Sequence, residues 1–276
     1  MKRTDTRALF RPLCTEIVSL LRTLSPEDWE RPTVARAWGV RDIAAHLLDT
    51  ALRRLSFHRD RFTPPAPARP LGNERDFVAF VNDLNAIWVD AARRLSPRVL
   101  TDLYDLASQD LCDFIEKLPD DAPALFPVSW AGDRESAGWL DVGREFTEIW
   151  HHGAQIRDAL GAGPFAEPRW LRAVLEISLH ALPHAYREVQ APDGASLAIQ
   201  ISGPSGGSWT LRRSGADWNA SEGAEANPTA RATMSDDAAW RLFFNALPAG
   251  AAAGLVRLEG NRELGAPLLR ARSVIV

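Results

Sequence analysis

Glu148 and His152 are the two side chains whose types and spacing most directly indicate chemistry. They lie four residues apart in GREFTEIWHHGAQIRDALG, residues 143–161, a segment with a helical pattern. On a helix this spacing places both side chains on one face, one turn apart, so both could bind a single metal ion. His151, three residues from Glu148, competes for this role, but it points about 100° of helix rotation away from His152.

A third ligand must come from elsewhere, because two donors do not make a metal site. His46, in WGVRDIAAHLLD, is the best candidate. It lies between two alanines and two leucines, on or beside an apolar stripe, where a buried imidazole needs a polar partner. Two histidines and one carboxylate leave coordination positions open, as in catalytic rather than structural sites. Spacing therefore makes His46, Glu148 and His152 a candidate set of ligands for a divalent ion.

A simpler interpretation of these histidines stays open on spacing alone, and so does a rival row of residues. A histidine with a glutamate one turn away is commonly a pair on a helix surface. A second row of residues, Glu176, His180, His184 and Glu188, has the same four-residue spacing. Pro183 falls inside this row and would kink the helix or remove a backbone hydrogen bond. We interpret the row as a solvated or interdomain face rather than as a second metal site.

The elements that must position these residues are helical up to about residue 188. Apolar residues at i+3 and i+4 spacing predict helices over about 9–24, 39–62, 74–95, 97–118, 137–160 and 169–184. The four prolines of TPPAPARP, residues 63–70, end the second helix. Arginine pairs such as 53–54 are interpreted as solvated faces. Four or more long amphipathic helices with short links predict an up-down helical bundle.

After residue 190 the sequence changes to short, alternating, β-branched segments. Strand patterns occur in SLAIQISG, SWTLRRSG, TARATMS and LVRLEG, and GPSGGSW is typical of a hairpin turn. DDAAWRLFFNAL and ELGAPLLRARSVIV have helical patterns. The predicted class is therefore α+β, with a helical bundle over residues 1–190 and a small α+β domain over residues 191–276.

Composition excludes several classes of function. The 276 residues are 46% hydrophobic and 25% charged, as in ordinary globular proteins. A net charge of −4 gives no reason to expect nucleic acid or a membrane as partner, and no segment approaches the ~20 apolar residues of a membrane span. Two cysteines, Cys14 and Cys112, are too few for a disulfide scaffold. We expect a cytoplasmic protein acting on a small molecule; its oligomeric state stays open.

Three segments of the sequence resemble the maleylpyruvate isomerase family, whose members are DinB-like, mycothiol-dependent metalloproteins. The element W-x-V-R-D-x-x-x-H ends at His46, and EIWHHG is similar to the family's E-x-W-x-H-G segment. TARATMSDDAAWRLF and VRLEGNRELGAPLLRA resemble its sterol-carrier-like C-terminal domain. The resemblance implies a four-helix bundle in which two histidines and a carboxylate, here His46, His152 and Glu148, hold the ion.

The resemblance also implies a chemistry that uses a low-molecular-weight thiol, mycothiol in the isomerase. A thiolate activated at the metal would add to an activated double bond and leave after rotation, and thiol transfer to an electrophile is the related outcome. The chain departs from its relatives at Gln155, where an aspartate is frequent. The basic residue that orients the substrate stays open among four arginines of the C-terminal domain, namely Arg212, Arg213, Arg231 and Arg241.

The sequence therefore predicts a divalent-metal-dependent, thiol-using isomerase or transferase that acts on a small electrophilic substrate. The alternative is a non-catalytic metal-binding protein, or a small-ligand-binding or regulatory one. A ligand-binding protein would need an enclosed apolar pocket within residues 191–276. Neither cysteine is placed for chemistry, so any thiol that reaches the metal must arrive as a separate small molecule.

Overall fold

The chain folds into two compact units. The computed structural model describes all residues except 36, 68–71, 133–134, 249 and 275–276. The helical unit comprises Thr6–Leu125 and Glu148–Phe165, and the mixed unit comprises Met1–Asp5, Phe126–Thr147 and Ala166–Val276. The boundary between the units therefore falls inside one helix, α6 (Gly138–Leu160). The domain boundary predicted after residue 190 stays a prediction.

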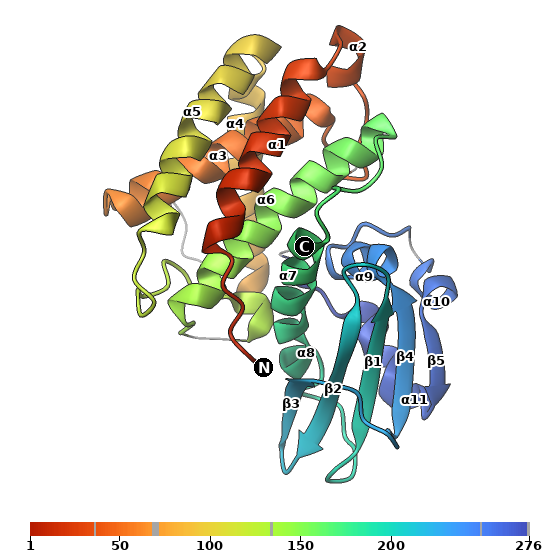
Figure 1. The fold of residues 1–276 in the computed structure, drawn as a ribbon. Helices are drawn as coiled ribbons and strands as arrows, with labels where there is room; N and C mark the ends of the chain where they lie inside the picture. The colour runs from red at the N-terminus through yellow and green to blue at the C-terminus, as the bar shows by residue number, and fades with distance from the viewer. Residues whose placement is uncertain (36, 68–71, 133–134, 249, 275–276) are drawn as a thin grey trace. The chain divides into compact units, whose positions relative to one another are not determined.

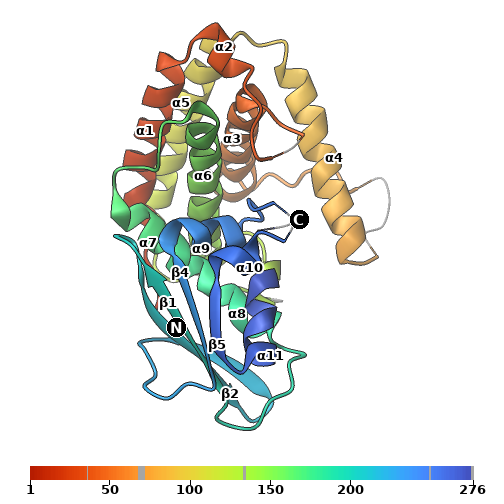
Figure 2. The same ribbon diagram turned by 90° about the vertical axis from the view of Figure 1, so that its right-hand side faces the viewer.

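The helical unit is a bundle in which α3 and α5 lie at the centre of the contacts. Its helices are α1 (Phe10–Thr23), α2 (Pro26–Trp29), α3 (Val40–Arg54), α4 (Glu74–Ala92), α5 (Pro97–Glu116) and the second half of α6. Helix α5 packs against both α1 and α3, and α4 packs against α3 (Figures 1 and 2). Gly153 of α6 lies against Ile17 of α1, so α6 completes the bundle.

The helices of this unit begin where the sequence supplies caps. Ser25 and Asp28 form a capping box at the start of α2. The Ser96 side chain accepts a hydrogen bond from the backbone N–H of Val99 at the start of α5. Helix α3 is shorter than predicted: it ends at Arg54 and continues as one wider π-helical turn, Leu55–Arg59. Residues 63–67 are not helical, and 68–70, the last residues of the proline-rich segment, lie outside the described residues.

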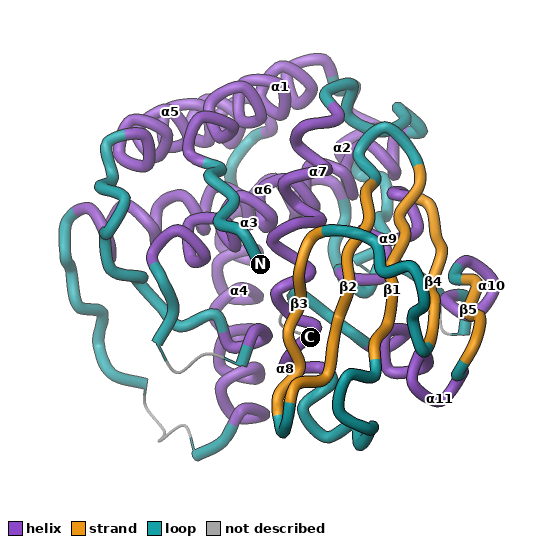
Figure 3. Tube along the Cα trace, turned by 60° about the horizontal axis from the view of Figure 1, so that its bottom comes forward, coloured by secondary structure: helices purple, strands orange, loops and turns teal. Residues whose placement is uncertain are grey.

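The mixed unit contains a five-stranded sheet with the strand order β3-β2-β1-β4-β5 (Figure 3). The strands are β1 (Ser196–Ser202), β2 (Gly207–Ser214), β3 (Asp217–Glu222), β4 (Ala230–Ser235) and β5 (Arg257–Gly260). Strands β1 and β4 are parallel, and the other neighbours are antiparallel. The remaining helices are α7 (Pro168–Ser178), α8 (Leu182–Ala185), α9 (Asp236–Phe243), α10 (Ala252–Leu255) and α11 (Arg262–Gly265). The predicted α+β class is confirmed, and so is the hairpin turn between β1 and β2.

Three elements of the mixed unit differ from the prediction. The helix expected over 169–184 is interrupted by a 3-10 turn, Leu179–Ala181, and Pro183 lies in the first turn of the short α8 that follows. Strand β3 was not predicted, because this short edge strand buries Trp218 alone and consists mainly of polar residues that are rare in strands. The prediction of a helix in ELGAPLLRARSVIV is wrong in its extent, because α11 ends at Gly265 and a 3-10 turn, Ala266–Arg270, follows it.

In the part of the chain that the structure describes, none of the helices combines the length and the apolar character needed to cross a membrane.

Candidate metal centre

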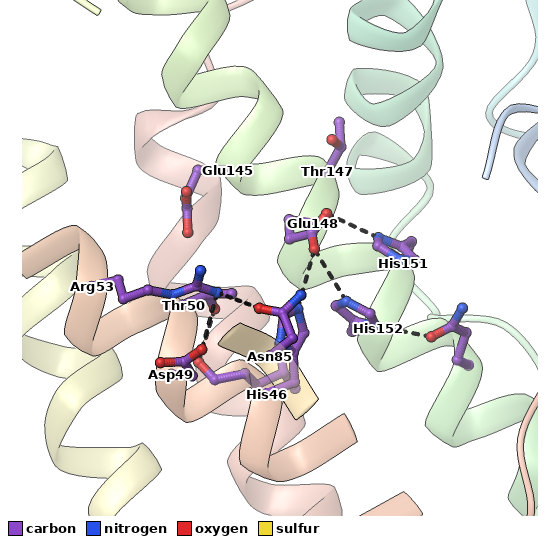
Figure 4. A network of polar contacts seen from close by, with 12 residues as sticks. His46, Asp49, Thr50, Arg53, Asn85, Glu145, Thr147, Glu148, His151 and His152 are labelled. Atoms are coloured by element: carbon purple, nitrogen blue, oxygen red, sulfur yellow. Dashed lines mark hydrogen bonds and ion pairs between the residues drawn. The ribbon is translucent and has the colours of Figure 1, made fainter. Parts of the chain in front are cut away.

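Helices α3 and α6 bring His46, Glu148 and His152 together inside the helical unit. One ligand atom from each lies within 4.8 Å of the other two. A single carboxylate oxygen, Oε1 of Glu148, is 3.4 Å from Nε2 of His46 and 3.2 Å from Nε2 of His152 (Figure 4). Among the described residues, no other group of three histidine, cysteine or acidic side chains converges in this way.

Apolar packing on both helices fixes the positions of these three side chains. His46 is buried in α3 between Ala45 and Leu47, which are also buried, so its imidazole cannot turn out to water. His152 is buried on α6, whereas 24% of the Glu148 side chain remains exposed. Glu148 is therefore the most exposed of the three donors, and the two imidazoles are shielded from water.

The protonation states of the apo protein suit a divalent ion. Burial, which disfavours a charged imidazole, lowers the pKa of His46 to about 4, and the charge of His152 acts in the same direction. Burial alone would raise the pKa of Glu148, but the charge of His151 and the hydrogen bonds with His152 and His46 outweigh it and hold that pKa well below its usual range. A neutral imidazole and an ionised carboxylate are the forms that bind metal.

His151 occupies a different position from the three converging residues. Its Nδ1 lies 3.8 Å from Oε2 of Glu148, the oxygen that faces away from the shared contact with His46 and His152. Its ring also stacks on that of His152, with 4.0 Å between centroids. The structure therefore separates the two histidines that helical spacing left in competition: His152 points to the common centre and His151 to the outer carboxylate oxygen.

Comparison with protein families decides the relationship of the chain to known proteins. The family model described as the mycothiol maleylpyruvate isomerase N-terminal domain matches residues 10–157, which is more than half of the chain. The chain belongs to this family. The match extends from the start of α1 nearly to the end of α6, so it includes all three converging residues.

Solved structures show that the fold of the isomerase is shared. The crystal structure of the mycothiol-dependent maleylpyruvate isomerase is similar with a TM-score of 0.53 at 13% sequence identity, over 92% of this chain and 91% of that one. A histidine-to-alanine mutant of that isomerase gives a TM-score of 0.46 at 14% identity, with the same coverage. A comparison with curated proteins gives no match.

Gln155, at the position where the family resemblance led us to expect an aspartate, contacts His152 directly. Its Oε1 lies 2.9 Å from Nδ1 of His152, and the contact is buried. An amide oxygen only accepts, so Nδ1 of His152 donates to Gln155, and Nε2 is the ring nitrogen left to face Glu148 or an ion. His46 differs, because its buried Nδ1 has no hydrogen-bond partner among the described residues. The donor set therefore fits a divalent ion, with Gln155 orienting one of its two imidazoles.

We expect Gln155→Leu to weaken zinc binding by about 10- to 100-fold, because partners of metal-bound histidines contribute at this level. Zinc affinity measured by competition with a chromogenic chelator gives the number. Gln155→Glu is the matched control, since a carboxylate also accepts from Nδ1 and should keep zinc affinity at or above the wild-type value. Equal zinc affinities for Gln155→Leu and the wild type would contradict this role.

Trp38 lies between a cavity of the helical unit and the two histidines His46 and His152. Its ring centroid is 4.8 Å from that of His46 and 6.2 Å from that of His152. The half-buried indole also lines a cavity of about 360 Å³, together with Trp29, Arg41 and Arg93. The cavity lies at the N-terminal end of α3, and Trp38 is the wall that it shares with the candidate metal centre.

A polar network that sequence reasoning missed lies on α3 beside His46. Nη2 of Arg53 is 3.1 Å from Oδ2 of Asp49 and 3.1 Å from Oδ1 of Asn85, a buried residue of α4 (Figure 4). The interpretation of arginines 53 and 54 as a solvated face is wrong, because Arg54 is buried and Arg53 is held by two partners. No signal in the sequence could pair Arg53 with Asn85, since the contact depends on how α4 packs against α3.

The second row of histidines is not brought together as a ligand set. His180 lies in the 3-10 turn after α7, where its ring packs against Trp139 with 5.3 Å between centroids. His184 belongs to α8 and packs against Gly132. The interruption of the helix before Pro183 removes the four-residue spacing from a common face, as predicted.

The four arginines proposed for substrate orientation all lie in the mixed unit. Arg212 pairs with Glu225 at 2.6 Å, and Arg241 pairs with Asp237 at 3.0 Å. The guanidinium of Arg213 lies 5.7 Å from the centre of the Trp218 ring. The structure gives these three side chains partners within their own unit, and it singles out none of the four arginines.

Proposed function

We propose that this protein is a divalent-metal-dependent isomerase or transferase that uses a low-molecular-weight thiol such as mycothiol and acts on a small electrophilic substrate. The observation that carries the proposal is the convergence of His46, Glu148 and His152 in a chain of the mycothiol maleylpyruvate isomerase N-terminal domain family. Zinc is the proposed ion. The two free cysteines are consistent with a reducing, cytoplasmic compartment.

The proposed roles of the ligands follow from their contacts. His46 and His152 would each offer Nε2, and Glu148 would offer Oε1, the atoms that already face one another. A divalent ion bound there supplies a positive charge that lowers the pKa of a bound thiol and polarises a nearby carbonyl. Three protein ligands leave at least one coordination position for the reacting molecules.

The surrounding side chains would hold this arrangement in place. Gln155 keeps the proton of His152 on Nδ1, away from the donors. His151 faces the second oxygen of Glu148 and favours its ionised form. Trp38 covers the two imidazoles on one side and limits the access of water there. Cys14 and Cys112 are buried on α1 and α5, so the reacting thiol would be a separate molecule.

Removal of the metal is expected to abolish thiol-dependent turnover. The protein would be stripped with a chelator, assayed for isomerisation of maleylpyruvate in the presence of mycothiol, and assayed again after addition of zinc. We expect a rate loss of at least about 100-fold that zinc restores, because the ion supplies several kcal/mol of charge stabilisation. Omission of mycothiol is the control for thiol dependence.

The same assay also separates the alternatives. An unchanged rate in the stripped protein would contradict metal dependence. A protein that holds stoichiometric zinc yet turns over no thiol and electrophile pair would instead favour the non-catalytic metal-binding or ligand-binding function.

A further inference from the structure

The helical unit carries one cation beside the candidate ligands for which the proposed mechanism has no use. Arg53 lies seven residues after His46 on α3, two turns along the same face, and Asp49 lies between them on that face. The charge of Arg53 is near enough to His46 to contribute to lowering its pKa. Arg53 therefore belongs to the surroundings of the three converging donors.

The guanidinium of Arg53 is held in place by one of its nitrogen atoms. Its contacts with Asp49 and with Asn85 both involve Nη2. Nε is buried and has no hydrogen-bond partner among the described residues, and 30% of the side chain remains exposed. Figure 4 shows Nη2 directed at Asp49 and Asn85, while the rest of the guanidinium group carries no dashed contact. The guanidinium group of Arg53 therefore keeps an N–H donor without a hydrogen-bond partner in the described part of the chain, and Asp49 and Asn85 fix the position of the group.

This contrasts with the arginines that make purely structural pairs in the same unit. Arg11 on α1 uses both Nε and Nη2 to bind Glu116, and Nη2 also reaches Asp113. Two carboxylates of α5 therefore bind both Nε and Nη2 of Arg11. Arg53 is fixed by two contacts, one with the carboxylate of Asp49 and one with the neutral amide of Asn85, so it faces one carboxylate where Arg11 faces two.

We propose that Arg53 binds a carboxylate group of the substrate beside the metal centre. The inference rests on the proposed function and adds to it the residue that would hold a carboxylate of the substrate. A guanidinium offers a planar fork of N–H donors that matches a carboxylate, which makes arginine the residue of choice for this contact. The charge of a divalent ion, only partly offset by Glu148, adds to the attraction for an anion.

Asp49 and Asn85 act in this proposal as positioning residues. They hold Nη2 and so direct the rest of the guanidinium group. Asn85 belongs to α4, which is attached to α3 by a hydrogen bond of 2.8 Å from Nε1 of Trp88 to the carbonyl oxygen of Ala45. The packing of α4 against α3 therefore fixes the orientation of the anion-binding side chain.

Binding of maleate, a simple dicarboxylate, to the zinc-loaded protein tests the proposal. Isothermal titration calorimetry would compare the wild type with Arg53→Met, Arg53→Lys and Arg98→Met. Arg98 is the matched control, because its side chain is 92% exposed and its ion pair with Asp102, at 3.8 Å, lies on α5. We expect maleate to bind at least about tenfold more weakly to Arg53→Met and unchanged to Arg98→Met, with zinc content unaltered in both.

Equal maleate affinities for Arg53→Met and the wild type would overturn the proposal and leave direct binding to the metal. Arg53→Lys keeps the charge opposite Asp49 and serves as the decisive variant should Arg53→Met fail to retain zinc. It offers a point charge instead of a fork, so we expect weaker maleate binding, and an unchanged affinity would overturn the proposal. The readout is binding, so a wild-type protein that binds maleate through Arg53 but has no thiol-dependent turnover would contradict the proposed function alone.

Discussion

Replacing His46, Glu148 or His152 singly by alanine is expected to reduce bound zinc from about one ion per chain to less than about a tenth of that value. Each of these residues supplies one of three donors, and two donors alone hold an ion weakly. The effect should be similar for all three, because one carboxylate oxygen faces both imidazoles. Elemental analysis of the purified proteins after gel filtration measures the zinc content directly.

Two other histidines serve as controls for the loss of zinc. His58 packs its ring against Phe114, 4.9 Å between centroids, and His58→Ala should keep the full zinc content. His151→Ala removes the partner of the outer carboxylate oxygen and should keep most of the zinc, because His151 lies outside the converging group. Stoichiometric zinc in all three alanine variants of the proposed ligands, each shown by circular dichroism to be folded, would refute the triad.

Trp150→Ala is expected to lower the free energy of unfolding by about 3–5 kcal/mol, the usual cost of truncating a fully buried large aromatic side chain. Trp150 lies on α6 between Glu148 and His152 and is almost completely buried. Its ring centroid is 5.9 Å from that of Phe165, at the end of the segment that follows α6. The cavity left by alanine would loosen the helix that supplies two of the three donors, so zinc affinity should fall with stability.

Denaturation in guanidinium chloride, followed by circular dichroism on zinc-free protein, isolates the packing contribution from that of the metal. Trp150→Phe is the graded control, since it preserves the ring contact with Phe165 and should cost clearly less than alanine. A free energy of unfolding for Trp150→Ala within about 1 kcal/mol of the wild type would show that this part of α6 is not packed as described.

The three converging donors could be predicted because each left a local signal. Glu148 and His152 are one helical turn apart, and His46 stands in an apolar stripe where an imidazole needs a partner. The family resemblance pointed to the same residues, and the structure brings them within reach of one another across 102 residues of chain. That they bind a metal stays a proposal until zinc is measured.

The anion-binding proposal could not have been made from the sequence, for a physical reason. The role proposed for Arg53 depends on its contact with Asn85 on α4. A contact between two helices does not change the periodic pattern of either sequence, so it cannot be predicted from that pattern. Basic residues near one another are usually solvated, so the pair Arg53 and Arg54 did not indicate a buried position or a binding role. Strand β3 escaped prediction because it is a short strand at the edge of the sheet and consists mainly of polar residues, among which Trp218 alone is buried.

The separation of the donors along the chain also sets the order of events during synthesis. A chain that has been made only as far as α5 contains His46 but neither of the other two donors. Glu148 follows His46 by 102 residues, and at typical synthesis rates this length of chain takes about 5–20 s to add. An ion held by these three residues would therefore enter only after α6 has been made and has packed against α3, so that nascent and truncated chains would not sequester zinc.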